Sequence, residues 1–187
     1  MLTVSINGGG MLKKRSGKNR NRQVLILDDD PQHGELLALA LSDRGAEVFP
    51  SNSPRELFNL LQDNNAIHVV VTDMVMKNAM VDGFTPEETG SGRYTGAAVA
   101  KRIVNLYPNK KVFTYSAVAL PEAQAANLKA IGVKHYTKME MKKLERAIML
   151  SLHTSLLGLL KSLPWKRISG GIGLIAALIT IFAAILS

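Results

Sequence analysis

Short, largely apolar runs alternate with segments of helical periodicity through most of the chain. Five such runs are of the kind that forms buried parallel strands: 24–27, 46–49, 67–71, 111–115 and 133–136. Helical segments lie between and after them, and we predict helices starting at Pro31, starting at Pro54, and over 96–106, 121–130 and 140–152. This alternation predicts right-handed crossovers and an α/β fold with a parallel sheet covered by helices on both faces.

One predicted connection is unusually long. The segment from Lys77 to Thr95 is polar and rich in glycine, and we interpret it as a long loop before the helix at 96–106. Loops of this length inside a domain often carry function, by covering a site or binding a partner, but a passive surface loop is an equal alternative.

Polar residues that could take part in chemistry follow four of the predicted strands. They are Asp28, Asp29 and Asp30 after the first strand, Asp73 after the third, Ser116 after the fourth and Lys138 after the fifth. The carboxyl ends of parallel strands meet at one edge of a sheet, so we expect these side chains to lie close together. Singly, each is common at a strand end, where an Asp usually serves a turn or a cap. Together they indicate a site.

The residue types in this set suit phosphoryl chemistry. Crowded carboxylates repel one another, and a hard divalent cation such as Mg²⁺ relieves that repulsion while also binding phosphate oxygens. An aspartate can act as a nucleophile toward phosphorus and form an acyl phosphate. A lysine ammonium and a serine hydroxyl can donate to the transferred phosphoryl oxygens.

The segments around these residues resemble the receiver domains of two-component response regulators. The similar segments are VLILDDDP at 24–31, VVVTDMVM at 69–76, VFTYSA at 112–117 and GVKHYTK at 132–138. The resemblance implies a doubly wound, flavodoxin-like sheet of five parallel strands in the order 2-1-3-4-5.

The resemblance also implies a role for each residue of the site. Asp73 would accept the phosphoryl group. Mg²⁺ would be held by Asp28, Asp29, Asp73 and the backbone carbonyl of Val75, with Asp29 as the direct ligand of the first pair. Ser116 and Lys138 would contact the phosphoryl group, while Ser116 and His135 would form the switch. Such a protein is no enzyme apart from its own Mg²⁺-dependent phosphorylation and dephosphorylation.

Two departures from the family's pattern leave an alternative open. Lys77 and Met139 stand where receivers usually have proline. A degenerate receiver acting as a constitutive, membrane-associated scaffold is therefore the alternative to a phosphorylated switch. The complete set of acids, together with Ser116 and Lys138, favours the switch.

The resemblance implies partners as well. A histidine kinase or a phosphotransfer protein would donate the phosphoryl group in a phosphorelay, and an unknown output protein would bind the switched surface. We expect no DNA-binding output module. A stripe of leucines beyond residue 152 also leaves a homodimer open.

The first 22 residues form a basic arm. Residues 13–22 contain six Lys or Arg and no acid, which contributes much of the formal net charge of +8, and we predict a disordered arm over 1–22. The arm contains no aromatic residue for base stacking, so nucleic acid is not a favoured partner. The chain has no cysteine, which excludes disulfides and zinc–thiolate sites.

The other end of the chain is uncharged. Residues 168–187 contain no Asp, Glu, Lys or Arg, and twenty residues in a helix span about 30 Å, the thickness of a bilayer core. Trp165, Lys166 and Arg167 precede this segment as interfacial residues would. We predict a receiver domain over 23–152, an amphipathic linker helix over 153–167 and a transmembrane anchor over 168–187. This places the domain on the cytoplasmic face of the inner membrane; a cytoplasmic protein whose tail packs on a partner is the alternative.

Overall fold

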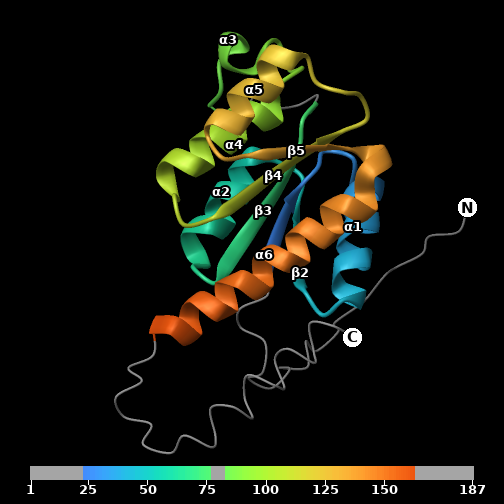
Figure 1. Cartoon of the computed structure of the whole chain (residues 1–187). Coiled ribbons are helices and arrows are strands. Elements are labelled where there is room, and N and C mark those ends of the chain that lie inside the picture. The colour runs from blue at the N-terminus through green and yellow to red at the C-terminus, as the bar shows by residue number, and fades with distance from the viewer. Residues whose placement is uncertain (1–22, 77–82, 163–187) are drawn as a thin grey trace, which may run out of the picture. The chain divides into compact units, whose positions relative to one another are not determined.

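Five parallel strands form one sheet in the order β2-β1-β3-β4-β5 (Figure 1). The strands are β1 (Gln23–Leu27), β2 (Glu47–Ser51), β3 (Ile67–Asp73), β4 (Lys111–Ser116) and β5 (Lys134–Thr137). The structure is a computed structural model that describes residues 23–76 and 83–162, without the side chains of 154–162. The predicted strand number, direction and order are confirmed.

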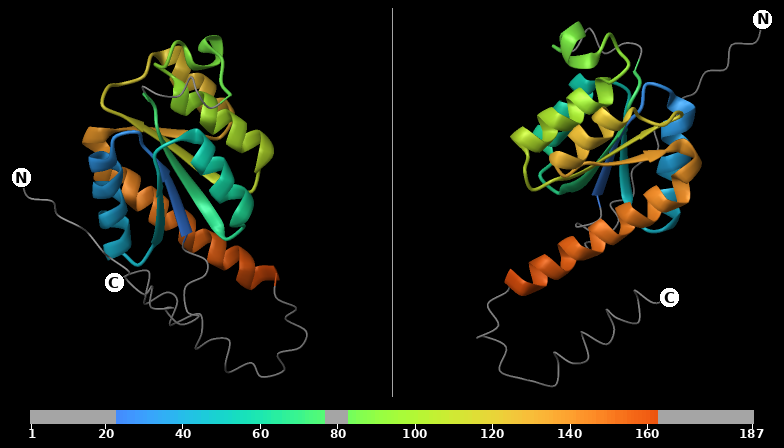
Figure 2. Two further views of the ribbon diagram at one scale, coloured as in Figure 1. Left: turned by 180° about the vertical axis from the view of Figure 1, so that it is seen from behind. Right: turned by 45° about the horizontal axis from the view of Figure 1, so that its top comes forward.

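Helices cover both faces of the sheet (Figure 2). They are α1 (Pro31–Asp43), α2 (Pro54–Asp63), α3 (Pro86–Thr89), α4 (Thr95–Leu106), α5 (Glu122–Ala130) and α6 (Met141–Ser162). The core beneath α2, α4 and α5 includes Leu57, Val99 and Leu128, whereas the core on the opposite face includes Leu41 and Ile148 from α1 and α6. The central strands β1, β3 and β4 are therefore buried on both faces, as their continuous apolar runs predict.

Local capping fixes where the first two helices begin. The Asp30 side chain accepts a hydrogen bond from the backbone N–H of Gln32 at 3.0 Å, and the Ser53 side chain accepts one from Glu56 at 3.3 Å. In both helices proline follows the cap. It lacks a backbone N–H, and at this first helical position an N–H would have no partner within the helix. The start of α1 is thus set directly after the acidic triplet.

The long loop predicted from Lys77 to Thr95 needs a correction, because part of it is helical. Thr85 caps α3 in a capping box with Glu88: the Thr85 side chain accepts from the Glu88 N–H at 3.2 Å, and the Glu88 carboxylate accepts from the Thr85 N–H at 2.8 Å. Four residues are too few for an apolar periodicity. The pattern Thr-Pro-Glu-Glu at 85–88 was nevertheless a signal for this helix start.

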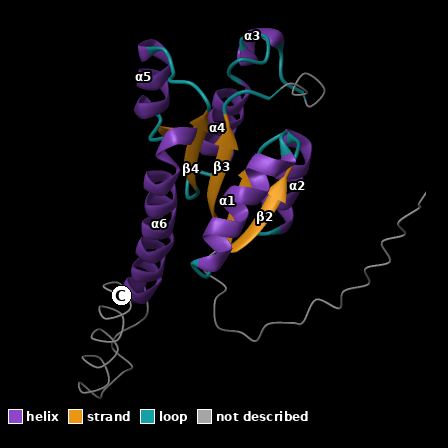
Figure 3. Ribbon diagram, turned by 90° about the vertical axis from the view of Figure 1, so that its right-hand side faces the viewer, coloured by secondary structure: helices purple, strands orange, loops and turns teal. Residues whose placement is uncertain are grey.

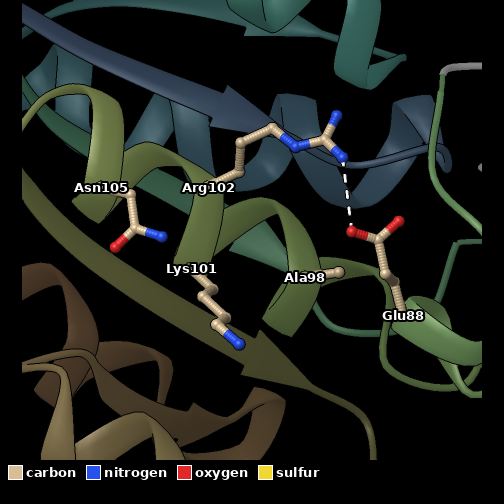
Figure 4. A pocket seen from close by; sticks show the side chains of 5 residues that line it. All are labelled: Glu88, Ala98, Lys101, Arg102 and Asn105. Carbon is tan, nitrogen blue, oxygen red and sulfur yellow. Dashed lines mark ion pairs between the residues drawn. The ribbon is translucent and has the colours of Figure 1, made fainter.

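Arg102 of α4 ties the segment around α3 to the domain. Its guanidinium lies 3.6 Å from the ring centroid of Phe84, forms an ion pair with Glu88 at 3.6 Å (Figure 4) and donates to the Gly83 carbonyl at 3.2 Å. These contacts hold residues 83–94 against α4. Residues 77–82 of the predicted loop lie outside the described residues.

Three predictions concern the chain ends. The basic arm at 1–22 and the anchor at 168–187 lie outside the described residues, as does the linker beyond Ser162. The helix predicted over 140–152 is longer, since α6 continues to Ser162. Within residues 23–76 and 83–162, no helix combines the length and apolar character needed to cross a bilayer.

Candidate functional site

The register of the sheet brings the predicted site residues to one edge. Leu27 pairs with Thr72, Asp73 with Tyr115, and Ser116 with Thr137, so neighbouring strands end level with one another. Figure 3 shows the strand arrowheads pointing toward the same end of the domain. Asp73 and Ser116, which end their strands, and Asp28 and Lys138, which follow theirs, therefore gather in a cluster at the carboxyl edge of the sheet.

Three carboxylates meet in this cluster. Asp28, Asp29 and Asp73 each offer an oxygen, and these oxygens lie within 4.8 Å of one another. Asp28 and Asp73 are buried and Asp29 is partly buried. A donor set of carboxylate oxygens at this spacing fits Mg²⁺, which prefers a few carboxylates with water and phosphate oxygens completing its shell.

Asp73 lies between opposing charges. One carboxylate oxygen accepts from the Met74 N–H at 2.7 Å, and the other accepts from the Lys138 ammonium at 3.1 Å. Burial, and secondly the Asp28 charge, raise the pKa of Asp73, while Lys138 and Met74 act in the lowering direction. The net direction is upward, because desolvation and a neighbouring like charge both disfavour the carboxylate.

Lys138 joins two of the acids. Its ammonium lies 3.1 Å from Asp73 Oδ2 and 3.6 Å from Asp28 Oδ2. A short 3₁₀ helix over Lys138–Glu140 begins at this residue, and the Thr137 N–H that precedes it donates to Glu140 at 3.2 Å. The strand and the capped turn together direct the lysine over the carboxylates.

Ser116 and His135 are bonded away from the carboxylates. The buried Ser116 hydroxyl donates to the carbonyl of Val118, in the loop that follows β4. His135 Nδ1 lies 3.0 Å from the Thr114 hydroxyl, and burial lowers the pKa of its imidazole against the opposing effect of Glu140. Among the described residues, no hydrogen-bond partner reaches its buried Nε2. Their switching roles stay predictions.

Val75 follows Asp73 by two residues, in the loop that leaves β3, and its side chain is exposed. This places its backbone at the edge where the acids gather. The part of its carbonyl in metal binding stays a prediction.

Two residues of the site were missed by sequence reasoning. Tyr115 is fully buried, and its hydroxyl donates to Asp28 Oδ2 at 2.5 Å. His33 Nδ1 lies 3.1 Å from the Lys138 ammonium and 3.2 Å from Asp30 Oδ2. Tyr115 reads as an ordinary strand residue. His33 carried only one signal, its place in the helical turn that follows the acids.

The N-terminus of α4 packs directly on the backbone of Asp73. The Gly96 N–H donates to the Met74 carbonyl at 3.0 Å, and the Thr72 hydroxyl donates to the Gly96 carbonyl at 3.3 Å. These hydrogen bonds fix the loop that follows Asp73. They also connect α4, which holds the segment around α3, to the backbone of the site.

The chain is similar in structure to several solved receiver domains. The chain is similar to a response regulator receiver domain protein from Clostridium thermocellum (22% identity, TM-score 0.57, covering 72% of this chain and 97% of that one). It is also similar to the receiver domain of a Francisella response regulator (19%, 0.56, 72% and 98%) and to a CheY-like receiver domain protein from Methanospirillum hungatei (13%, 0.53, 70% and 95%). No protein-family model and no curated protein sequence matches the chain.

At identities of this size the likeness establishes the fold. The chain therefore carries a receiver fold, with an acidic cluster and a lysine at the edge of the sheet where parallel α/β proteins place their working residues.

Proposed function

We propose that this protein is a phospho-accepting response regulator of a two-component system or phosphorelay, phosphorylated on Asp73. The observation that carries the proposal is the placement of Asp73: a buried carboxylate beside Asp28 and Asp29, with the Lys138 ammonium 3.1 Å away. A histidine kinase or a phosphotransfer protein would be the donor. The function rests on this site and on the receiver fold of the chain.

The chemistry is a displacement at phosphorus. A carboxylate oxygen of Asp73 forms the new P–O bond as the bond between phosphorus and the donor's leaving atom breaks, which gives an acyl phosphate. Lys138, now shared between Asp73 and Asp28, would donate to the transferred phosphoryl oxygens. Mg²⁺, when held by Asp28, Asp29, Asp73 and the Val75 carbonyl, supplies positive charge that offsets the acids and the phosphoryl group.

Phosphorylation would be transmitted through Ser116. In the structure its hydroxyl donates to the Val118 carbonyl, and we infer that on phosphorylation it turns to the phosphoryl group, moving the loop that leads into α5. That helix buries only Leu128 among its side chains, so a shift of α5 disturbs little packing. His135 on β5 would follow, and an output protein would bind the changed surface.

The test is the phosphoryl adduct. The full chain in a mild detergent, incubated with Mg²⁺ and a small acyl phosphate, should gain the mass of one phosphoryl group by intact mass spectrometry. The Asp73→Asn variant should gain none, because an amide is not a nucleophile toward phosphorus. The matched control is Asp63→Asn at the end of α2, which should be modified like the wild type.

Two outcomes would contradict the proposal. A phosphoryl adduct that persists in Asp73→Asn would place the accepting residue elsewhere. A wild-type chain that gains no adduct, although it is folded, would favour the constitutive scaffold instead.

We also propose that the uncharged segment at 168–187 tethers the domain to the cytoplasmic face of the inner membrane. The support is its composition and the cations before it, Lys161, Lys166 and Arg167. The full chain should sediment with membranes and resist extraction by high salt, whereas a chain lacking 165–187 should stay in the supernatant. Equal distribution of the two chains would contradict the tether.

A further inference from the structure

A tyrosine lies beneath the acidic cluster, with its hydroxyl on one of the acids and its ring beside Lys138. Tyr115 belongs to β4 and is fully buried, in the core that α1 and α6 form with the sheet. Its ring is enclosed by apolar side chains, while its hydroxyl reaches the carboxylate of Asp28, which follows β1. Buried tyrosine hydroxyls need a partner, and here the partner is a proposed metal-holding acid.

The two oxygens of Asp28 are both engaged. Oδ1 accepts from the Asp30 N–H at 2.9 Å, and Oδ2 accepts from the Tyr115 hydroxyl at 2.5 Å. Two donors on opposite oxygens fix the rotation of a carboxylate group. An ionised carboxylate can only accept hydrogen bonds, so the Tyr115 hydroxyl is the donor of this pair.

The ring of Tyr115 meets the other half of the site. The Lys138 ammonium lies 5.1 Å from the ring centroid, within the range of a cation–π contact. The same ammonium is 3.1 Å from Asp73 Oδ2 and 3.6 Å from Asp28 Oδ2. One side chain therefore touches the acid proposed to hold the metal and the lysine proposed to hold the phosphoryl group.

We propose that Tyr115 is a positioning residue of the phosphorylation site, whose hydroxyl orients Asp28 for divalent cation binding and whose ring supports Lys138. The proposal deepens the function proposed above and rests on it. Removing a side chain that is hydrogen-bonded to a metal-binding carboxylate commonly lowers the metal affinity by about 10- to 100-fold. Without the hydroxyl, Asp28 Oδ2 would retain the more distant Lys138, which would then be drawn from Asp73.

Tyr115→Phe isolates the hydroxyl, because it keeps the ring beside Lys138. Mg²⁺ affinity of the full chain, measured by calorimetric titration in a mild detergent without any phosphodonor, should fall by about tenfold or more. Tyr136→Phe, which removes a phenol hydroxyl from the neighbouring strand β5, is the matched control and should bind Mg²⁺ like the wild type. Equal affinity of Tyr115→Phe and wild type would overturn the proposal.

A double-mutant comparison tests whether Tyr115 acts through Asp28. Tyr115→Phe should weaken Mg²⁺ binding in the wild-type background and change it little in an Asp28→Asn background, because the acid that it orients is then absent. Equal losses in both backgrounds would indicate a general effect on packing and would contradict the positioning role.

One measurement needs no variant and remains available if Tyr115→Phe fails to fold. The buried hydroxyl proton shared with Asp28 should give a slowly exchanging proton resonance in the wild type, and this resonance should shift when Mg²⁺ is added. If Mg²⁺ binds but this resonance does not shift, the proposal is overturned. A wild-type chain that binds no Mg²⁺ at all would instead contradict the metal requirement of the proposed function, so the two failures are distinguishable.

Discussion

Replacing Lys138 by methionine should slow phosphorylation of the chain by about 10²–10³-fold, the usual cost of removing one preorganised donor to developing oxyanion charge. The ammonium is already in place beside Asp73 and Asp28, and methionine keeps the unbranched apolar part of the lysine side chain without the ammonium. The rate of adduct formation, followed by intact mass at fixed Mg²⁺ and phosphodonor, measures the effect. Lys134→Met, at the exposed start of β5, the strand that leads to Lys138, should react at the wild-type rate. A Lys138→Met chain as fast as wild type would show that the lysine serves the structure alone.

The same variant should change the pH dependence of stability. The folded-state pKa of Asp73 is raised, and Lys138 acts against that rise. An acid whose pKa is raised by folding contributes stability that is complete below its ordinary pKa, which is 3.8 for Asp73. This stability is lost as the pH rises through the pKa of the folded state. Without Lys138 the pKa rises further, so Mg²⁺-free Lys138→Met should lose more stability than wild type between acidic and neutral pH in urea unfolding. In an Asp73→Asn background this additional loss should vanish.

The fold was predictable because its signals are local. The run Val69–Val71 is apolar and β-branched, as is typical of a strand buried on both faces, and Pro31 and Pro54 follow side chains that cap helices. Strand order followed from the resemblance, whereas parallel direction followed from the helices between strands. The signals that failed were short ones, such as the single turn of α3, whose caps are visible in the sequence but whose four residues carry no periodicity.

The site was predictable only as far as chain position determines it. Asp28, Asp73 and Lys138 directly follow or end strands, so parallel topology alone brings them together. Tyr115 reaches Asp28 because a long side chain crosses beneath a neighbouring strand end. Strand alternation says which face a residue takes, but not how far its terminal atom extends. The partner of the Ser116 hydroxyl depends likewise on the conformation of the loop at Val118.

Gly96 stands where the first turn of α4 meets the backbone of Asp73 and Met74. A Cβ at Gly96 would lie 2.0 Å from the Asp73 carbonyl oxygen, 2.7 Å from its carbonyl carbon and 2.8 Å from Met74 Cα. All three atoms are backbone, and they belong to the loop held by the hydrogen bonds of Gly96 with Met74 and Thr72. No rotamer change can relieve such a contact, so α4 or the Asp73 loop would have to move.

Gly96→Ala should therefore destabilise the domain by more than about 3 kcal/mol, beyond the usual cost of overpacking, although alanine is the better helix former. Urea unfolding of the full chain in a mild detergent, followed by circular dichroism, measures the loss. Gly34→Ala is the matched control: its new Cβ would meet Asp28 Cβ at 3.6 Å, an ordinary contact, so stability should stay within about 1 kcal/mol of wild type. Because the displaced backbone is that of Asp73, any folded Gly96→Ala chain should also accept the phosphoryl group more slowly. A variant with wild-type stability would mean that α4 begins farther from Asp73 than its hydrogen bonds indicate.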